Sequence, residues 1–434
     1  MAIATAERSS TERAPPRRDA YSVLQERGFI YQCSDEAGLR RALAAGPVTF
    51  YVGFDPTGNS LHIGHLVQVM AMAHLQRAGH RPIAVVGAGT TMIGDPTDRT
   101  SGRRIMSREE IDANAAIFRR QLSQFLDFSE SPEYPEGRGI MENNADWLRP
   151  LNYIAFLRDY GRYFSVNEML RMETYRTRLE GGLTFIEFNY ALLQAYDFLE
   201  LYRRYGCRLQ IGGSDQWSNI LAGADLIRKV EGGEAYALTL QLLADPTGQK
   251  MGKTSASGQV WLDPAQTPPY DFYQHWINAD DPAVGRLLAY YTFLPLEEIA
   301  ALTAAQGEAL RSAKERLALE VTTLVHGEAA AAEAQRAARV LFGTATPEEL
   351  ATSEAVPTTE LDRAQLEAGI SAADLLVFIG LADSKGAARR LLEQGGAYLN
   401  GERLAARMVS TADLRDGMLL LRAGKKRHRR LIVH

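Results

Sequence analysis

An alternation of strand-like and helix-like segments near the start of the chain most constrains its fold. Residues 48–54, VTFYVGF, form a short apolar run, and residues 61–79 repeat apolar side chains at helical spacing. A second strand-like run at residues 81–90 leads into a glycine-rich loop. A strand, a helix and a strand in this order predict a βαβ unit. The chain is therefore expected to contain an α/β domain with a parallel sheet covered by helices.

The segments that follow extend this pattern. Helical spacing recurs at residues 107–125, 152–160 and 185–205, and the sequence CRLQIGG at 207–213 is typical of a strand. Residues 241–256 combine Gly, Pro, Lys and Thr without an apolar period, so we expect a mobile loop there.

Changes in composition predict further domains. Residues 269–342 are rich in Ala and Leu at helical spacing, without a strand signal, which indicates a helical domain. A stretch rich in Thr, Pro and Glu follows and is typical of a linker. Asn400-Gly401 then predicts a β-hairpin. The expected parts are a disordered tail at 1–20, an α/β domain at 21–256, a helical domain at 257–342, a linker at 343–366 and an α+β module at 367–434.

Charge separates the last part from the rest. Residues 369–434 carry twelve Lys or Arg and six Asp or Glu, whereas the whole chain of 434 residues has a net charge of −5. A basic module on an acidic body suits contact with a nucleic acid, but a merely solvated basic surface has the same composition. Charge alone leaves both interpretations open.

The two cysteines bear on the compartment and on metal binding. Cys33 and Cys207 lie far apart and have no metal-ligand spacing. Isolated thiols favour a reducing cytoplasm over a disulfide framework. The longest apolar runs, such as residues 375–381, are too short to cross a bilayer. We expect a cytoplasmic protein without a metal site of its own.

The segment His62-Ile63-Gly64-His65 follows the first strand and begins the predicted helix. Backbone N–H groups at a helix N-terminus favour anions, and histidines three residues apart project from one helix face. Gly64 lets a flat base lie against the backbone. The segment therefore suits a nucleoside triphosphate. Two surface histidines on an ordinary helix are the alternative, and a zinc site lacks a third ligand of suitable spacing.

A second motif, Lys250-Met251-Gly252-Lys253-Thr254, lies in the predicted loop. Two ammonium groups on a loop can offset the charge of a departing pyrophosphate. A P-loop is excluded because Thr247 stands where that motif needs a glycine, and because no helix pattern follows. Taken alone, this lysine pair fits a solvated loop better than a nucleotide site.

Together the two motifs resemble the signature pair of class I aminoacyl-tRNA synthetases. The resemblance is to the bacterial tyrosyl-tRNA synthetase family and runs in order through YVGFDPTGNSLHIGH, IGDPT, EFNYALLQAYD, LQIGGSDQW and KMGKT. The C-terminal SKGAARRLLEQGGAYLNG resembles the RNA-binding module of that family. The similarity covers nearly the whole chain after the tail. It implies a Rossmann-like catalytic domain, a helical anticodon-side domain and a small α+β RNA-binding module.

The resemblance also implies a pocket for tyrosine. A carboxylate that faces a phenolic hydroxyl makes a charge-assisted hydrogen bond and is left unpaired when phenylalanine enters. The binding residues would be Tyr51 and Asp197 at the hydroxyl, Tyr190, Gln194 and Asp95 at the α-ammonium group, and Gln216 at the acyl group. Tyr190, Gln194 and Asp197 lie at i, i+4 and i+7 and so share one helix face. The alternative is that this face packs into the core.

Further roles follow from the same resemblance. Val52 and Met251 depart from residues common in relatives, Cys and Phe, without changing these assignments. ATP would be bound by Asp55, Thr57, Gly64, Gly213, Asp215 and Lys253; catalysis would involve His62, His65, Lys250, Lys253 and Thr254; and tRNA would be contacted by Lys385, Arg389, Arg390, Lys425 and Lys426.

The expected reaction has two steps. The tyrosine carboxylate attacks the α-phosphate of ATP, giving tyrosyl-adenylate and pyrophosphate, and tyrosine then passes to the 3′ end of its tRNA. Positioning and charge stabilisation suffice, so no nucleophile or general base is needed. Magnesium would arrive with ATP, no tightly bound cofactor is expected, and the resemblance implies a homodimer.

Three other classes of protein compete with this interpretation. An NAD-dependent oxidoreductase would use Gly87 and Gly89, but Met92 replaces the third small residue of that fingerprint. An RNA-binding protein without enzymatic activity leaves both motifs unexplained. In a tryptophan-charging enzyme an indole would offer only a donor, which makes the pair Tyr51 and Asp197 more suitable for tyrosine.

Overall fold

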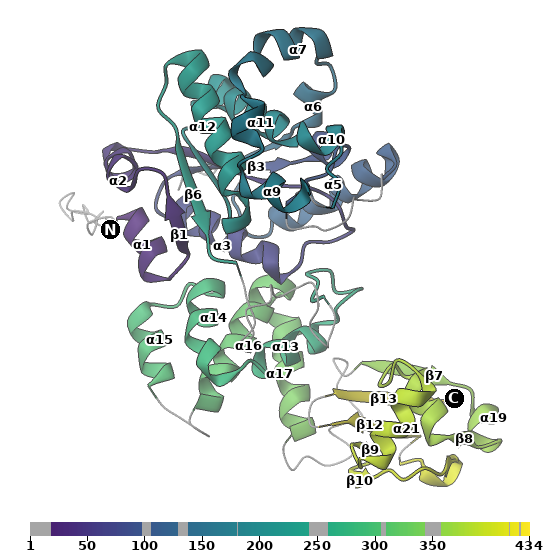
Figure 1. Ribbon diagram of the computed structural model, residues 1–434. Helices are drawn as coiled ribbons and strands as arrows, with labels where there is room; N and C mark the ends of the chain where they lie inside the picture. The colour runs from purple at the N-terminus through teal and green to yellow at the C-terminus, as the bar shows by residue number, and fades with distance from the viewer. Residues whose placement is uncertain are drawn as a thin grey trace, which may run out of the picture. The chain divides into compact units, whose positions relative to one another are not determined.

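The computed structural model describes residues 19–97, 106–128, 138–179, 181–242, 259–304, 310–342, 357–415, 417–424 and 427–434. The chain divides into two compact units (Figure 1). The first takes in most of the chain up to residue 251, and the second takes in residues 61–63 together with the chain from residue 252 onward. Within the described ranges, no helix is both long enough and apolar enough to cross a membrane.

A six-stranded sheet forms the centre of the first unit, in the order β1-β6-β5-β2-β3-β4. All neighbouring strands are parallel except the edge strand β1, which runs antiparallel to β6. The sequence predicted this parallel sheet and the strands β2, β3 and β5. The strands are β1 (Ile30–Cys33), β2 (Thr49–Phe54), β3 (Arg81–Val86), β4 (Ile140–Asn143), β5 (Leu209–Gly213) and β6 (Tyr236–Leu240).

Helices cover both faces of this sheet. Successive strand residues point to opposite faces, so Tyr51, Ile83 and Val85 share one of them. These three belong to one apolar cluster with α11 (Tyr190–Tyr205) and α12 (Trp217–Glu231). On the other face, Phe54 contacts His65 of α3 (Ile63–Arg77), which in turn contacts α5 (Arg108–Leu122).

Two predicted elements differ from those observed. The strand at residues 81–90 ends at Val86, and the glycine-rich segment after it forms the short helix α4 (Ala88–Thr91) instead of a loop. The helix predicted at 185–205 is divided at Asn189 into α10 (Phe185–Phe188) and α11. The Asn189 amide donates to the Phe185 carbonyl at 2.7 Å, and such back-bonding competes with helix continuation.

Shorter helices complete the first unit. They are α1 (Ala20–Glu26), α2 (Glu36–Ala45), α6 (Ala145–Leu148), α7 (Tyr153–Asp159), α8 (Val166–Met169) and α9 (Glu173–Leu179). Most of the predicted loop at 241–256 lies outside the described residues.

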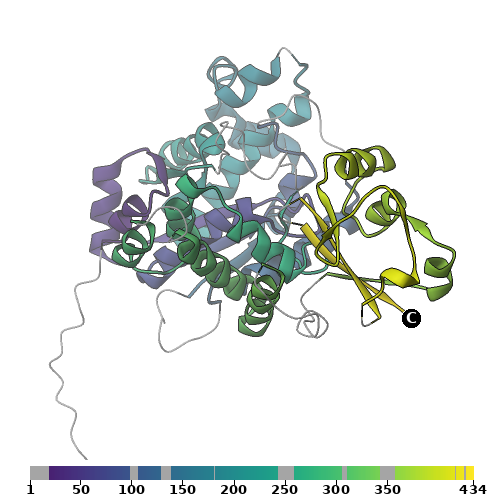
Figure 2. The ribbon, with the colours of Figure 1, turned by 90° about the horizontal axis from the view of Figure 1, so that it is seen from below.

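The second unit contains helices between residues 269 and 342, where the sequence shows helical spacing, and a small α+β module (Figure 2). The helices are α13 (Pro269–Ile277), α14 (Val284–Tyr291), α15 (Leu296–Thr303), α16 (Leu310–His326) and α17 (Glu328–Phe342). The module has a five-stranded sheet in the order β10-β9-β12-β13-β7. Its elements are β7 (Thr358–Leu361), α19 (Arg363–Glu367), β8 (Ile370–Ser371), α20 (Ala372–Phe378), α21 (Lys385–Glu393), β9 (Ala397–Leu399), β10 (Glu402–Arg403), β11 (Met408–Val409), β12 (Met418–Ala423) and β13 (Arg427–Val433).

Two details of the module bear on the sequence analysis. Asn400 and Gly401 join β9 to β10 with φ angles of 50° and 88°, so the predicted hairpin turn is confirmed. The sheet starts earlier than the sequence suggested, since β7 lies within the predicted linker and pairs in parallel with β13. The four residues of β7 are largely polar, which left no apolar pattern to reveal a strand.

Candidate active site

The polar residues of the first unit gather where its parallel strands end. Asp55 follows β2, α4 follows β3, Asn144 follows β4, and Asp215 and Gln216 follow β5. The strand order reverses between β5 and β2, because β3 and β4 lie on one side of β2 and β6 lies beyond β5. Ligands of open α/β sheets bind at such a switch point, outside the carboxyl ends of the strands.

Three buried polar atoms on β2, α11 and β5 have no hydrogen-bond partner among the described residues. They are the Tyr51 hydroxyl and the side-chain oxygens of Gln194 and Gln210. Tyr51 on β2 pairs in register with Gln210 on β5, so the two side chains lie on the same face of the sheet. The Tyr51 ring contacts Phe198 of α11 at 5.3 Å. Buried polar atoms are usually hydrogen-bonded, so a polar ligand bound among these three would satisfy them.

Asp197 is the buried carboxylate of this pocket, with 4% of its surface exposed. One of its oxygens accepts from the Trp147 indole at 2.7 Å and the other from the Asn144 amide at 2.9 Å. Burial raises the pKa of Asp197 to about 7, although both hydrogen bonds oppose the shift. Burial also raises the pKa of Tyr51 well above its usual value, and the nearby Asp197 charge adds to this shift.

Asn144 extends the network towards Asp55. Its amide donates to the Thr90 hydroxyl at 2.9 Å, and its carbonyl oxygen accepts from the Gly89 backbone at 2.7 Å. Thr90 donates to one oxygen of Asp55 at 2.7 Å. The Tyr190 hydroxyl donates to the other oxygen at 2.9 Å. The start of α11 is thereby tied to the ends of β2, β3 and β4.

Asp95 is a second carboxylate near the strand ends, since it pairs with Gln216 after β5. Asp95 accepts from the Gln216 amide at 2.8 Å and from the Thr97 backbone at 2.9 Å. Asn219 on α12 donates to the Gln216 oxygen at 3.2 Å. The structure thus brings together Asp95 and Gln216, two residues that the sequence analysis assigned to one pocket.

Close approach requires glycine at two positions of the rim. A Cβ atom at Gly87 would lie 2.0 Å from an Asp55 oxygen, and one at Gly213 would lie 2.4 Å from an Asp215 oxygen. Any side chain at either position would displace a carboxylate of the site. Thr57 is exposed beside them, and its backbone donates to Asp55 at 2.8 Å.

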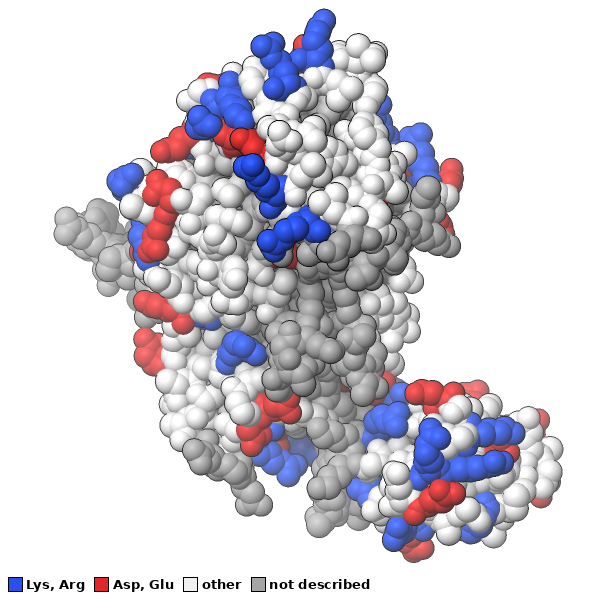
Figure 3. Space-filling view, viewed as in Figure 1, with Lys and Arg blue, Asp and Glu red and all other residues white. Residues whose placement is uncertain are grey.

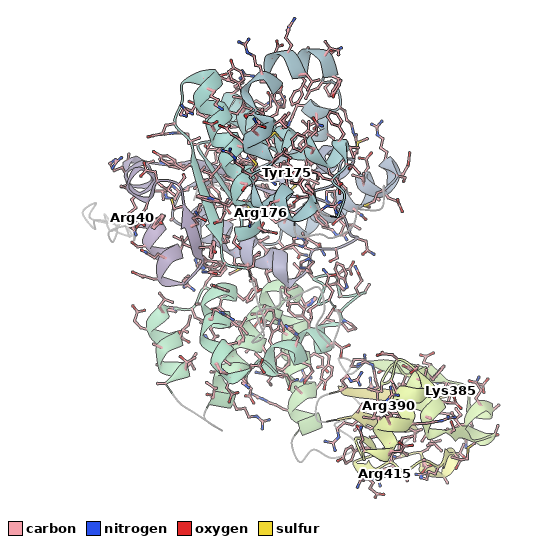
Figure 4. The ribbon with its side chains drawn as sticks, viewed as in Figure 1. Arg40, Tyr175, Arg176, Lys385, Arg390 and Arg415 are labelled. Atoms are coloured by element: carbon pink, nitrogen blue, oxygen red, sulfur yellow. The ribbon has the colours of Figure 1, made fainter. Side chains whose placement is uncertain are left out.

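Tyr175 holds the junction that leads into α11 (Figure 4). Its buried hydroxyl donates to the Phe188 carbonyl at 2.9 Å and accepts from the Ala191 backbone at 3.3 Å. Burial raises the pKa of this hydroxyl, so it stays protonated at neutral pH. Tyr190 and Gln194 are therefore carried by a helix whose first turn is fixed.

The two histidines of the HIGH segment do not share a helix face. Gly64 and His65 lie in the first turn of α3, whereas His62 precedes the helix and pairs with Trp261 in an antiparallel β-bridge. The prediction that both project from the first helical turns was therefore wrong for His62. At His62 the backbone forms this β-bridge, and the helix begins only at Ile63.

Some of the predicted residues are outside the described ranges, and others lie on the C-terminal module. Lys250, Lys253 and Thr254 fall outside the described residues, and so do Lys425 and Lys426. Lys385, Arg389 and Arg390 are exposed on α21 of the module, and Figure 4 marks Lys385 and Arg390. Lys385 pairs with Asp374 at 2.6 Å. Figure 3 shows that Lys and Arg are prominent on the visible face of the module.

The sequence analysis missed four residues of the pocket. Thr90, Asn144, Trp147 and Gln210 complete the hydrogen-bonding network or line the pocket. The sequence offered one signal for such residues, namely polar side chains that follow or interrupt an apolar strand. This signal could not be used at Asn144, because the strand β4 before it is too short to be predicted. Among the described residues, no group of three or more His, Cys, Asp or Glu side chains converges as a metal site would require.

Comparisons with known proteins identify the family of the chain. Residues 43–343 match the family described as tRNA synthetases class I (W and Y), and residues 349–431 match the tyrosine–tRNA ligase SYY-like C-terminal domain. The tyrosine–tRNA ligases of Caldanaerobacter subterraneus subsp. tengcongensis and Acetivibrio thermocellus are each 50% identical over 413 residues, covering 95% of this chain and 98% of their own.

A solved structure adds support for the fold. The C-terminally truncated mitochondrial tyrosyl-tRNA synthetase of Aspergillus nidulans superposes with a TM-score of 0.67 at 30% identity, covering 75% of this chain and 94% of its own. The chain belongs to the class I tRNA synthetases of the tryptophan and tyrosine family. Within this family, the relatives that match nearly its whole length are tyrosine–tRNA ligases.

Proposed function

We infer that the chain activates L-tyrosine with ATP to tyrosyl-adenylate and transfers the tyrosine to its tRNA. The observation that carries this inference is the pocket at the strand ends. It combines one buried carboxylate, Asp197, with a neighbouring hydroxyl and two carboxamide oxygens that lack partners among the described residues. A phenolic hydroxyl donates to the carboxylate and accepts from Tyr51, which satisfies both groups.

We propose that the other end of tyrosine lies beside Asp95. The α-ammonium group needs acceptors, and Asp95, Gln194 and Tyr190 supply a carboxylate, a carboxamide oxygen and a hydroxyl. Gln194 lies one helical turn after Tyr190 and one turn before Asp197, so α11 spans the length of the amino acid. Gln216, which is bonded to Asp95, would then contact the acyl group.

The nucleotide would lie over the ends of β2 and β5. Asp55, Thr57, Gly213 and Asp215 line this rim, and Gly64 and His65 open α3 beside it. The N-terminus of α3 would favour the phosphates. The roles of Lys250, Lys253 and Thr254 at the departing pyrophosphate stay a prediction from the sequence. We propose that Mg²⁺ enters with ATP, held largely by the phosphates, as is usual for this ion.

The reaction follows from this placement. The tyrosine carboxylate attacks the α-phosphorus of ATP, the bond to the β-phosphate oxygen breaks, and pyrophosphate leaves. A hydroxyl of the terminal tRNA ribose then attacks the acyl carbon, and AMP leaves. The protein residues bind, align and stabilise charge, and none of them forms a covalent bond.

We propose that the chain works as a homodimer in the cytoplasm. Large apolar side chains are exposed on α7, α8, α9 and α10 of the first unit, which is unusual for a free surface. They are Tyr153, Ile154, Val166, Leu179, Phe185 and Ile186. In light scattering, Phe185→Asp should halve the mass, whereas Tyr31→Asp on the edge strand β1 should leave it unchanged.

The proposed location in the cytoplasm is supported by two free cysteines, which suit a reducing compartment.

The experiment that tests the activity is ATP–pyrophosphate exchange with each of the twenty amino acids in turn. We expect exchange with tyrosine alone. Exchange that depends on tryptophan or phenylalanine instead would contradict the assignment.

A further inference from the structure

The backbone on both sides of His62 is held by the segment that follows residue 258. Ile63 donates its N–H to the Val260 carbonyl at 3.1 Å, and Leu262 donates to the Leu61 carbonyl at 2.9 Å. The Tyr291 hydroxyl of α14 donates to the Ile63 carbonyl at 2.8 Å. Residues 61–63 accordingly belong to the second unit, although α3 continues into the first.

These bonds bring one side chain opposite His62. The two backbone bonds flank the pair His62 and Trp261, which is therefore the non-hydrogen-bonded position of an antiparallel bridge. At such a position the two side chains stand closest together. The imidazole and indole rings meet edge to face, with centroids 6.0 Å apart and planes at 70°. This geometry is favourable for aromatic pairs.

Trp261 is itself fixed. Val260 and Leu262 are buried, so Trp261 projects from the opposite side of the segment. Its backbone N–H donates to the Thr267 hydroxyl at 3.0 Å. Thr267 and Gln266 both donate to the Asp263 carbonyl, at 3.0 Å each, which closes the turn after this segment. The indole therefore presents a constrained surface to the imidazole.

We propose that Trp261 is a positioning residue for the first histidine of the HIGH segment. Its ring restricts the His62 imidazole to one orientation, and its backbone aligns the peptide that leads into α3. The inference rests on the proposed function and on the catalytic role that the sequence resemblance implies for His62. A group that acts on charge developing in the transition state must be oriented beforehand, so the effect of Trp261 belongs in kcat for adenylate formation.

The test compares Trp261→Ala, Trp261→Phe, His62→Ala and the double variant Trp261→Ala/His62→Ala in tyrosine-dependent pyrophosphate exchange. Trp261→Ala should lower kcat by about two- to tenfold, the range typical of aromatic contacts of this kind. KM for tyrosine should not change, and Trp261→Phe should restore most of the rate. In the His62→Ala background, loss of the indole should cost little more, because the two residues act as one unit.

Leu262→Ala is the matched control. Leu262 is buried in the same segment and its backbone makes the other bridge bond, but its side chain points away from His62. It should lower the melting temperature at least as much as Trp261→Ala does and leave kcat unchanged. A loss of kcat in Trp261→Ala that is additive with His62→Ala, or that is matched by Leu262→Ala, would overturn the proposal.

A spectroscopic measurement separates this inference from the proposed function. The indole should shift the ring resonances of His62, which are assigned in ¹³C-histidine-labelled protein by their loss in His62→Ala. We expect these resonances to move in Trp261→Ala and to return in Trp261→Phe. Unchanged resonances would refute the contact even if tyrosine exchange is normal. If the intact chain shows no tyrosine exchange, the proposed function fails, while the resonances still decide whether Trp261 orients His62.

Discussion

The proposed tyrosine pocket and the C-terminal module use polar side chains in opposite ways. In the pocket, Asp197 is buried and accepts from two fixed donors, Asn144 and Trp147. In the module, the Lys385–Asp374 pair is 67% and 42% exposed, and the Arg415–Glu402 pair is 53% and 83% exposed. Buried charged hydrogen bonds are strong and depend on geometry, whereas exposed pairs contribute little singly and are screened by salt. Function should therefore depend on single residues in the pocket and on summed charge in the module.

The largest effect is expected from Asp197→Ala. The substitution removes the acceptor for the phenolic hydroxyl and leaves the Asn144 and Trp147 donors unpaired, a loss of about 2–5 kcal/mol for a buried charged group. Tyrosine-dependent pyrophosphate exchange should become undetectable or nearly so. Glu200→Ala, three residues further along α11, is the control, because that carboxylate pairs with Arg204 near the surface. Equal activity of the two variants would show that the pocket is misassigned.

Deletion of residues 343–434 should have the next largest effect, and it should affect only the transfer of tyrosine to tRNA. The pocket residues all precede the deleted part, so pyrophosphate exchange should persist. Aminoacylation of tRNA should fall strongly, because the basic surface is lost and Lys or Arg contacts to phosphates dominate such affinities. Both reactions are measured on one preparation whose melting temperature is compared with that of the intact chain. Parallel loss of both activities would mean that the module only stabilises the fold.

More of the pocket than of the module could be predicted from the sequence, because helical periodicity is a local signal. Tyr190, Gln194 and Asp197 were predicted to share one face of a helix, and the helix is confirmed. Asn144 and Trp147 were missed because a buried hydrogen bond between distant segments leaves no local periodicity. The strand β7 was missed because its four residues are mostly polar. His62 was placed on α3 because the sequence does not show that residues near 260 pair with it.

A smaller effect should appear in the pH dependence of stability and of tyrosine binding. The pKa of Asp197 is raised by burial from 3.8 to about 7, so the folded chain holds this proton between those values whereas the unfolded chain releases it. The contribution of Asp197 to stability therefore falls as pH rises across this window. Tyrosine binding needs the ionised form and should tighten as pH rises through about 7.

Trp147→Phe sharpens that prediction. The indole donor stabilises the Asp197 carboxylate, so its removal should raise the pKa further and move the midpoint of tyrosine binding upward by about one pH unit. The dissociation constant of tyrosine is measured from pH 5.5 to 8.5 in both proteins. A flat profile in the intact chain, or a midpoint that moves downward in the variant, would contradict the role of this bond.

The smallest effects are expected from single charges of the module. Arg389→Ala should weaken tRNA binding only about twofold, and it should lower the slope of log affinity against log salt by about one. The triple replacement of Lys385, Arg389 and Arg390 should reduce that slope by about three. Binding is measured between 50 and 200 mM salt, a range in which counterion release is pronounced. A single replacement that abolishes binding would place a specific contact in the module and remove the contrast with the pocket.

The comparison of tyrosine with phenylalanine binding tests the central claim most directly. The two amino acids differ by the hydroxyl that Asp197 and Tyr51 are proposed to bind, so the ratio of their dissociation constants reports on this end of the pocket alone. Calorimetric titration of the intact chain should show phenylalanine binding at least about a hundredfold more weakly, since a buried carboxylate and hydroxyl would be left unpaired. Equal affinity for the two amino acids would contradict the account.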